Sequence, residues 1–154
     1  MDEFEMKVFT LDEAQALLPV LESLLKRAIE GKKAAESIEG RMQELRHKIF
    51  LSGGLFVDVS RVRRQRAALE SHIQAAKDSV AEIDAIGVQV KDLETGLLDF
   101  PCQIDGEIVL LCWKLGEGRI DYWHTVEAGF RGRKPIDERF GSKQTKKPKP
   151  EQPN

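Results

Sequence analysis

Residues 96–114 read GLLDFPCQIDGEIVLLCWK, which is two apolar segments joined by Asp105-Gly106. An Asp-Gly pair in this position predicts a two-residue β-hairpin turn, because both turn residues need a positive φ angle that these two types adopt readily. Such a turn sets the register of the hairpin. Ile104 then pairs with Glu107, and counting outward places Asp99 directly opposite Cys112.

This register sorts the side chains of the hairpin onto two faces. One face is almost wholly apolar and is expected to be the core; it holds Leu98, Phe100, Cys102, Ile104, Val109, Leu111 and Trp113. The other face collects Asp99, Cys112 and Lys114 at one end. Because Cys102 and Cys112 point to opposite faces, we expect no disulfide between them.

The flanking sequence extends the hairpin into a small sheet and then loses its pattern. Alternation at Val88 and Val90 and the segment RIDYWH at 119–124 predict an antiparallel β-meander of three to four strands over residues 87–125. Residues 137–154 are polar, contain proline and have no periodicity, so a disordered basic tail is predicted there.

The sequence before the meander predicts two long helices. Thr10 and Glu13 fit a capping box, and apolar residues spaced by three and four positions then predict a helix over 10–50. A glycine-containing turn at 51–58 precedes a second helix over 59–86, capped by Asp58 or Ser60. Its expected seam consists of Val62, Leu69, Ala76 and Ile83, with Arg66, Ile73 and Val80 between them.

Two such seams predict an antiparallel, coiled-coil-like helical hairpin. If residues 49 and 60 face each other, a helix that rises ~1.5 Å per residue brings residue 86 back only to about residue 24. Residues 10–23 therefore overhang. Their apolar side chains, among them Leu17, Leu18 and Leu21, are expected to cover the sheet.

Residues 1–136 fit one folded α+β domain. The chain's 154 residues are enough for one core, and a net charge of −2 excludes a field that would attract polyanions over the whole surface. Met1–Phe9 lacks a signal-peptide pattern, and no 18 apolar residues are contiguous. A cytoplasmic protein without membrane contact, and with reduced thiols, is the expectation.

Four residue types that bind metals gather in the meander, namely Asp99, Cys112, Glu117 and His124. No CxxC or HExxH motif is present, so the pattern favours an open site of mixed ligands for a divalent ion such as zinc, manganese or iron. The competing interpretation is structural, with Cys112 as a small buried hydrophobe, Glu117 as a charge at a turn and His124 packed beside Trp123. The sequence leaves open whether His124 faces the Asp99 side of the sheet.

Two further interpretations concern the same residues. Cys112 as a nucleophile, with His124 as its base and Asp99 to orient the imidazole, would make a thiol-dependent enzyme, yet a thiol in mid-strand has little to lower its pKa. Arg131 and Arg133 lie close by in the sequence. A guanidinium there is expected either to pair with Asp99 or Glu117, which is the favoured interpretation, or to bind an anionic ligand.

Basic residues mark the tip of the predicted hairpin. Arg61, Arg63 and Arg64 begin the second helix and are expected to face a basic end of the first helix, which is a pattern that nucleic-acid-binding arms use. Interspersed acids and the expected lack of an exposed aromatic residue favour a solvated face instead. The hairpin is also a candidate surface for a homo-oligomer.

Several motifs together resemble an uncharacterised prokaryotic family called domain of unknown function 2203. They are FTLDEAQALLP at residues 9–19, GLLDFP, LCWKLGE, WH and GFRGR, and the likeness extends over residues 8 to about 136. The resemblance implies no activity, substrate or cofactor. It implies that nine residues belong to the family's motif: Asp99, Cys112, Trp113, Glu117, Trp123, His124, Gly129, Phe130 and Arg133.

Overall fold

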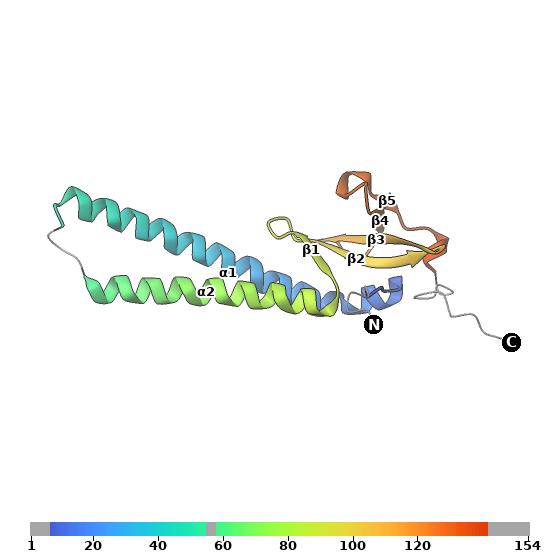
Figure 1. Ribbon diagram of the computed structural model, residues 1–154, viewed down its shortest axis with the longest axis horizontal. Helices are drawn as coiled ribbons and strands as arrows, with labels where there is room; N and C mark the ends of the chain where they lie inside the picture. The colour runs from blue at the N-terminus through green and yellow to red at the C-terminus, as the bar shows by residue number, and fades with distance from the viewer. Residues whose placement is uncertain (1–6, 55–57, 142–154) are drawn as a thin grey trace, which may run out of the picture. The chain divides into compact units, whose positions relative to one another are not determined.

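The computed structural model describes residues 7–54 and 58–141 of the chain. Helices α1 (Leu11–Leu51) and α2 (Val59–Ile86) pack against each other and precede a five-stranded antiparallel sheet, so the predicted α+β class is confirmed (Figure 1). The chain forms two compact units. The hairpin unit is Leu24–Ala81, and the sheet unit contains the described residues up to Ser23 and from Glu82 onward. Neither helix in the described part has an apolar stretch long enough to cross a bilayer.

Both helices begin where capping residues predict. The amide of Thr10 donates to Glu13 Oε1 at 3.0 Å and the amide of Glu13 donates to Thr10 Oγ1 at 3.1 Å, which is the reciprocal capping box. Asp58 Oδ1 accepts from the amide of Arg61 at 3.1 Å, so Asp58 is the residue that caps α2. The predicted turn between the helices includes residues 55–57, which lie outside the described residues.

The seam of α2 in the hairpin unit differs from the prediction. Val62, Leu69, Ala76 and Val80 are half-buried as expected, but Arg66 and Ile73 are exposed. The residues between the expected positions are instead Gln65, His72 and Ser79. The observed seam alternates steps of three and four residues, and its first step from Val62 is three residues, to Gln65. The prediction took a first step of four, because that choice placed the apolar residues Ile73 and Val80 on the seam.

Small residues allow the two helices to approach closely. A Cβ atom on Gly31 of α1 would lie 2.9 Å from the carbonyl oxygen of His72 and 3.3 Å from the Cβ of Ala76. Gly31 is therefore a packing residue, because a side chain there would meet the backbone of α2.

The sheet has the predicted register. Its strands are β1 (Gln89–Asp92), β2 (Leu97–Ile104), β3 (Glu107–Lys114), β4 (Tyr122–Thr125) and β5 (Lys134–Pro135), which are paired in chain order. Asp99 lies opposite Cys112, and the turn residues Asp105 and Gly106 have φ angles of 54° and 81°. The sheet has five strands, one more than the upper limit of the prediction. The additional strand is β5, whose two residues pair with Tyr122 and Trp123 of β4.

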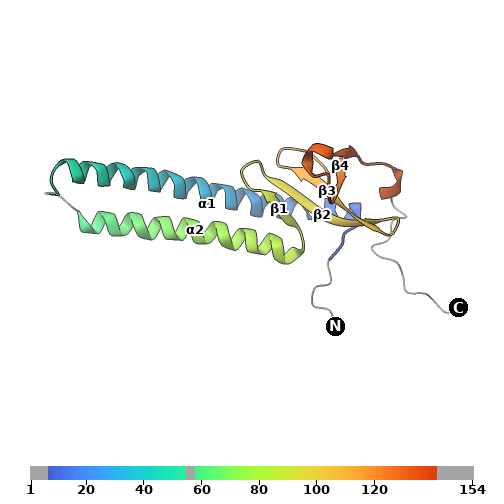
Figure 2. The same cartoon turned by 45° about the horizontal axis from the view of Figure 1, so that its top comes forward.

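The overhanging turns of α1 lie against the apolar face of the sheet. Gln15 Oε1 accepts from the amide of Ile120 at 2.8 Å, and the Phe9 ring meets Phe100 edge-on with 5.9 Å between centroids. Leu18 and Leu21 are buried. Figures 1 and 2 show these first turns beside β2 and β3, so the predicted overhang belongs to the sheet unit.

The opposite face of the sheet is also buried, which the sequence did not predict. Asp99, Leu110 and Cys112 on this face are at most 5% exposed. The segment after β4 covers Cys112, since Arg133 contacts its sulfur and the guanidinium stacks on the neighbouring Tyr122. Cys102 and Cys112 form no disulfide, in agreement with their placement on opposite faces.

Ordered structure continues past residue 136, where the folded domain was predicted to end. A 3₁₀ turn at Glu138–Phe140 buries Phe140, whose ring centroid lies 5.6 Å from that of Trp123. Residues 142–154 of the predicted tail lie outside the described residues.

Candidate metal centre

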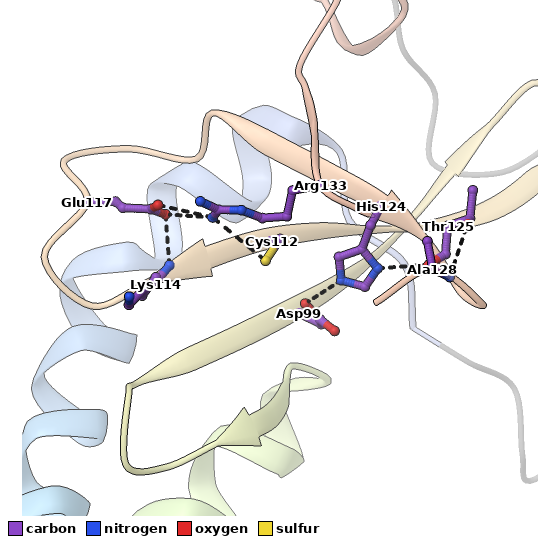
Figure 3. Close-up of polar contacts among 8 residues, drawn as sticks. All are labelled: Asp99, Cys112, Lys114, Glu117, His124, Thr125, Ala128 and Arg133. Carbon is purple, nitrogen blue, oxygen red and sulfur yellow. Dashed lines mark hydrogen bonds and ion pairs between the residues drawn. The ribbon is translucent and has the colours of Figure 1, made fainter. Parts of the chain in front are cut away.

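Three adjacent strands bring Asp99, Cys112 and His124 to one face of the sheet. Cys112 pairs with Asp99 across β2 and β3, while His124 on β4 pairs with Leu110. Residues 110 and 112 share a face because side chains alternate along a strand. His124 therefore faces the Asp99 side, which settles the point that the sequence left open. Figure 3 shows the three side chains and their neighbours.

The donor atoms of these three side chains converge. His124 Nε2 lies 3.1 Å from Asp99 Oδ1, and one ligand atom from each of the three residues lies within 4.8 Å of the others. All three residues are at most 2% exposed. Oxygen, sulfur and nitrogen donors thus meet in a space from which solvent is excluded.

The hydrogen bond at the other ring nitrogen fixes the proton arrangement of His124. Nδ1 lies 2.8 Å from the carbonyl oxygen of Thr125, which only accepts hydrogen bonds, so Nδ1 carries a proton. The contact between Nε2 and Asp99 needs a second proton, held by either atom. A histidine whose Nδ1–H donates to a carbonyl presents Nε2 as a ligand, which is the usual arrangement around protein-bound metals.

Asp99 carries a buried polar atom without a partner. Its Oδ2 is inaccessible to solvent and accepts no hydrogen bond from any residue that the structure describes. Burial raises the pKa of the Asp99 carboxyl above its ordinary value, and the nearby His124 only partly opposes that shift. A cation at Oδ2 would satisfy this oxygen.

Cys112 is a buried thiol whose pKa is raised to about 11 by burial and by the negative charge of Asp99, against the opposing effect of Arg133. Both ring nitrogens of His124 are engaged, with Thr125 and Asp99. Within the part of the chain that the structure describes, neither nitrogen forms a hydrogen bond with the sulfur. The geometry therefore disfavours the nucleophile interpretation and leaves a thiol that a metal ion would deprotonate.

Glu117, the fourth predicted ligand, is held apart from the three. Its Oε2 accepts from Arg133 Nη1 at 3.0 Å, and its Oε1 accepts from the amide of Lys114 at 2.9 Å. Arg133 Nη1 also lies 3.9 Å from Cys112 Sγ, so this guanidinium separates Glu117 from the thiol. Of the two carboxylate partners predicted for Arg133, the structure selects Glu117.

Two aromatic residues to which the sequence pattern assigned no role beside Arg133 hold its guanidinium in place. Its guanidinium carbon lies 4.0 Å from the ring centroid of Tyr122 and 4.5 Å from that of Phe130. Tyr122 pairs with Cys112, so its position follows from the register of β3 and β4. The seven-residue connection between these strands concealed that register.

A family model described as an uncharacterised conserved protein, DUF2203, matches residues 7–136. The chain belongs to the DUF2203 family. No curated protein and no solved structure matches it. The range matched in this DUF2203 domain includes the three convergent side chains and the basic hairpin tip.

The basic tip of the DUF2203 hairpin lies in the hairpin unit, away in sequence from the three donors. Arg61, Arg63 and Arg64 are exposed, and none has an ion pair with a described residue. The expectation that no aromatic residue is exposed here is wrong, because 79% of Phe50 is accessible. Phe50 stands one residue from the end of α1, where the helix offers little packing surface.

Proposed function

We propose that this DUF2203 domain binds one divalent transition-metal ion, with zinc preferred, through Asp99, Cys112 and His124. The observation that carries the proposal is the buried convergence of three ligand atoms within 4.8 Å of one another. The Nδ1–H of His124 and the unpartnered Oδ2 of Asp99 support it independently.

The donor set favours zinc or ferrous iron over manganese, calcium and magnesium. A thiolate and an imidazole are the ligands of the softer transition metals, whereas the harder ions prefer oxygen alone. Metal–ligand bonds of about 2.0–2.3 Å would place the donors roughly 3.5 Å apart. Donor pairs as far apart as 4.8 Å would therefore close by about an ångström, whereas the contact of 3.1 Å between His124 Nε2 and Asp99 Oδ1 would open slightly. One thiolate and one carboxylate together balance the two positive charges of the ion.

The burial of the cluster favours a structural role for this ion. The ligands come from β2, β3 and β4, so one ion would tie the three strands together beneath the segment that contains Arg133. Three protein ligands leave a fourth coordination position for water or another small ligand. Glu117 is already engaged by Arg133 and Lys114.

The test is elemental analysis of the full chain purified without an affinity tag, together with cobalt substitution. We expect close to one zinc or iron per chain, a thermal unfolding midpoint that falls on chelation, and thiolate-to-cobalt absorption in the cobalt form. Cys112→Ser and His124→Ala should lose the metal. Cys102→Ser, which removes the other buried thiol on the opposite face, and His72→Ala should keep it.

Circular dichroism separates loss of the site from loss of the fold in each variant. At an ion concentration a thousand times the dissociation constant, binding stabilises a fold by about 4 kcal/mol, so the shift on chelation is measurable. The proposal fails if the folded, metal-free protein takes up neither zinc, cobalt nor iron. It also fails if His124→Ala binds cobalt as tightly as the parent protein does.

A second candidate function uses the hairpin tip to bind nucleic acid. It is favoured by the three exposed arginines and by the exposed ring of Phe50, since arginine pairs with phosphates and an aromatic ring stacks on bases. A third proposal is self-association through the same region, where Leu51 and Val59 are also exposed. Light scattering at several protein concentrations tests the latter, and a constant monomer mass would exclude it.

A further inference from the structure

A pocket of about 370 Å³ opens in the sheet unit beside the proposed metal centre. Its lining consists of Asp92, Thr95, Leu97, Lys114, Ala128, Phe130 and Arg131. Leu97 and Lys114 pair with each other on the same sheet face as Asp99 and Cys112, one side-chain repeat further along the strands. The volume lies within the range of about 300–1,000 Å³ that is typical of small-molecule sites.

The pocket has an excess of positive charge. Lys114 and Arg131 both line it, and neither forms an ion pair within the part of the chain that the structure describes. The only acid in the lining is Asp92, whose two oxygens accept from the amide of Glu94 at 3.1 Å and from the hydroxyl of Thr95 at 3.0 Å. Asp92 is thus held in its own turn by neutral donors, and the lining carries two positive charges against one negative charge.

The remaining wall is apolar and partly fixed. Leu97, Ala128 and Phe130 supply it, and the Phe130 ring stacks on Arg133, which the ion pair with Glu117 holds in place. Lys114 Nζ lies 5.9 Å from the centroid of the same ring. An ordered ring next to an ammonium group suits a ligand with an apolar body and a charged end.

We infer that this pocket binds a small organic oxyanion, with its carboxylate or phosphate group between Lys114 and Arg131 and its apolar body against Phe130. Both residues recognise carboxylates and phosphates. Arginine donates two parallel hydrogen bonds to two oxygens, and lysine presents a compact positive charge. The inference goes beyond the proposed metal site. None of the three metal ligands lines the pocket, so either proposal can fail alone.

The experiment is an amide-resolved NMR titration of the full chain, kept metal-free with a chelator. The probes are phenyl phosphate, benzoate and, as the uncharged counterpart, benzyl alcohol. We expect phenyl phosphate or benzoate to shift amides around Leu97, Lys114, Ala128 and Phe130, and the stronger of the two identifies the class of oxyanion. Benzyl alcohol should bind at least tenfold more weakly, because it lacks the charge.

Charge variants test the role of the two cations. Lys114→Ala and Arg131→Ala should each weaken binding of the better probe by about tenfold, which is the usual effect of losing one charge-assisted hydrogen bond. Lys77→Ala, an equal charge change at an exposed site on α2, should leave the affinity unchanged. Arg131 is exposed, so its truncation leaves the core intact if Lys114→Ala fails to fold.

Three results would overturn the inference. One is the absence of localised shifts with either anion at millimolar concentration. Another is equal weakening by Lys77→Ala, which would indicate attraction by net charge alone. The third is equal binding of benzyl alcohol, which would indicate a merely apolar pocket. Because the protein is metal-free throughout, a failed metal proposal leaves each of these results interpretable.

Discussion

His124 Nε2 lies 3.1 Å from Asp99 Oδ1 in a region where both side chains are almost completely buried. The contact satisfies one carboxylate oxygen and leaves the other without a partner among the described residues. In the absence of a cation this arrangement costs folding free energy, because a buried charge is only partly compensated.

Asp99→Asn should stabilise the metal-free protein at neutral pH. The folded-state pKa of Asp99 is raised above the ordinary value of 3.8, so the parent fold loses stability as the pH rises from about 3.8 through that raised pKa. A neutral amide removes this loss. We expect a gain on the order of 1 kcal/mol, or about 2–4 °C in Tm, for a domain of this size.

Thermal unfolding of both proteins with chelator, between pH 3 and pH 8, checks this prediction. The difference in Tm should shrink at the acid end, where Asp99 is protonated in both the folded and unfolded states. Added zinc should stabilise only the parent protein. A variant that is less stable than the parent at pH 7 would mean that the Asp99–His124 pair is net stabilising, contrary to the argument.

Cys112 should react slowly with alkylating reagents at neutral pH. Its pKa of about 11 leaves little thiolate at pH 7, and the sulfur is buried. In a Cys102→Ser background, where Cys112 is the only cysteine, iodoacetamide labelling followed by mass spectrometry should be slower than labelling of glutathione. The rate should rise as the pH is raised. Rapid labelling at pH 7 would instead support an activated thiol and the enzyme interpretation.

The register of the sheet was predictable because one local signal determines it. Asp105-Gly106 fixes the turn, and the turn fixes the pairing of Asp99 with Cys112. The side on which His124 lies was not predictable. It depends on the conformation of residues 115–121, which carry no comparable signal, and a shift of one residue would have reversed the face.

Two other features escaped prediction because they arise from tertiary packing. In α2, Gln65, His72 and Ser79 occupy seam positions although they are polar. At His72 the reason is the close approach of Gly31, where the backbone of α2 rather than an apolar side chain makes the contact. Phe140 stands in a polar, charged stretch that reads as disordered, yet it packs on Trp123. A single buried aromatic residue produces no repeating apolar pattern, so the sequence around it does not predict a folded segment.

The position of Phe140 predicts where the domain can be truncated. A chain that ends at residue 141 keeps Phe140, whereas one that ends at residue 136 loses it and should be markedly less stable than the chain ending at 141. Phe140→Ala should cost about 3–5 kcal/mol, as expected for a buried phenylalanine. Denaturant unfolding measures all three. Equal stability of the chain ending at 136 would show that Phe140 contributes nothing to the fold.

The nucleic-acid alternative predicts salt-dependent binding through Arg61, Arg63 and Arg64. If each contacts one phosphate, replacing all three by alanine should reduce the slope of log affinity against log salt by about 2–3. Fluorescence anisotropy with labelled single-stranded and double-stranded oligonucleotides measures this. A matched triple variant at Lys32, Lys33 and Lys77, elsewhere on the same helices, controls for net charge. Absence of binding at low salt would exclude this function.

Two glycines of α1 provide a paired test of helix packing. Alanine has the higher helix propensity by about 1 kcal/mol, so Gly40→Ala, where a Cβ atom meets nothing within 4 Å, should stabilise the protein by up to that amount. At Gly31 the same Cβ would lie 2.9 Å from the backbone oxygen of His72, and the helices would have to move apart. Such overpacking costs about 1–3 kcal/mol, which exceeds the gain in propensity.

Gly31→Ala should therefore lower the free energy of unfolding while Gly40→Ala raises it, although the chemical change is identical. Urea unfolding followed by circular dichroism resolves the sign of each effect. The double variant should show the sum of the two, since the sites are nine residues apart on one helix. Stabilisation by both substitutions would mean that the helices are not in close contact at Gly31, and the polar seam through His72 would lose its explanation.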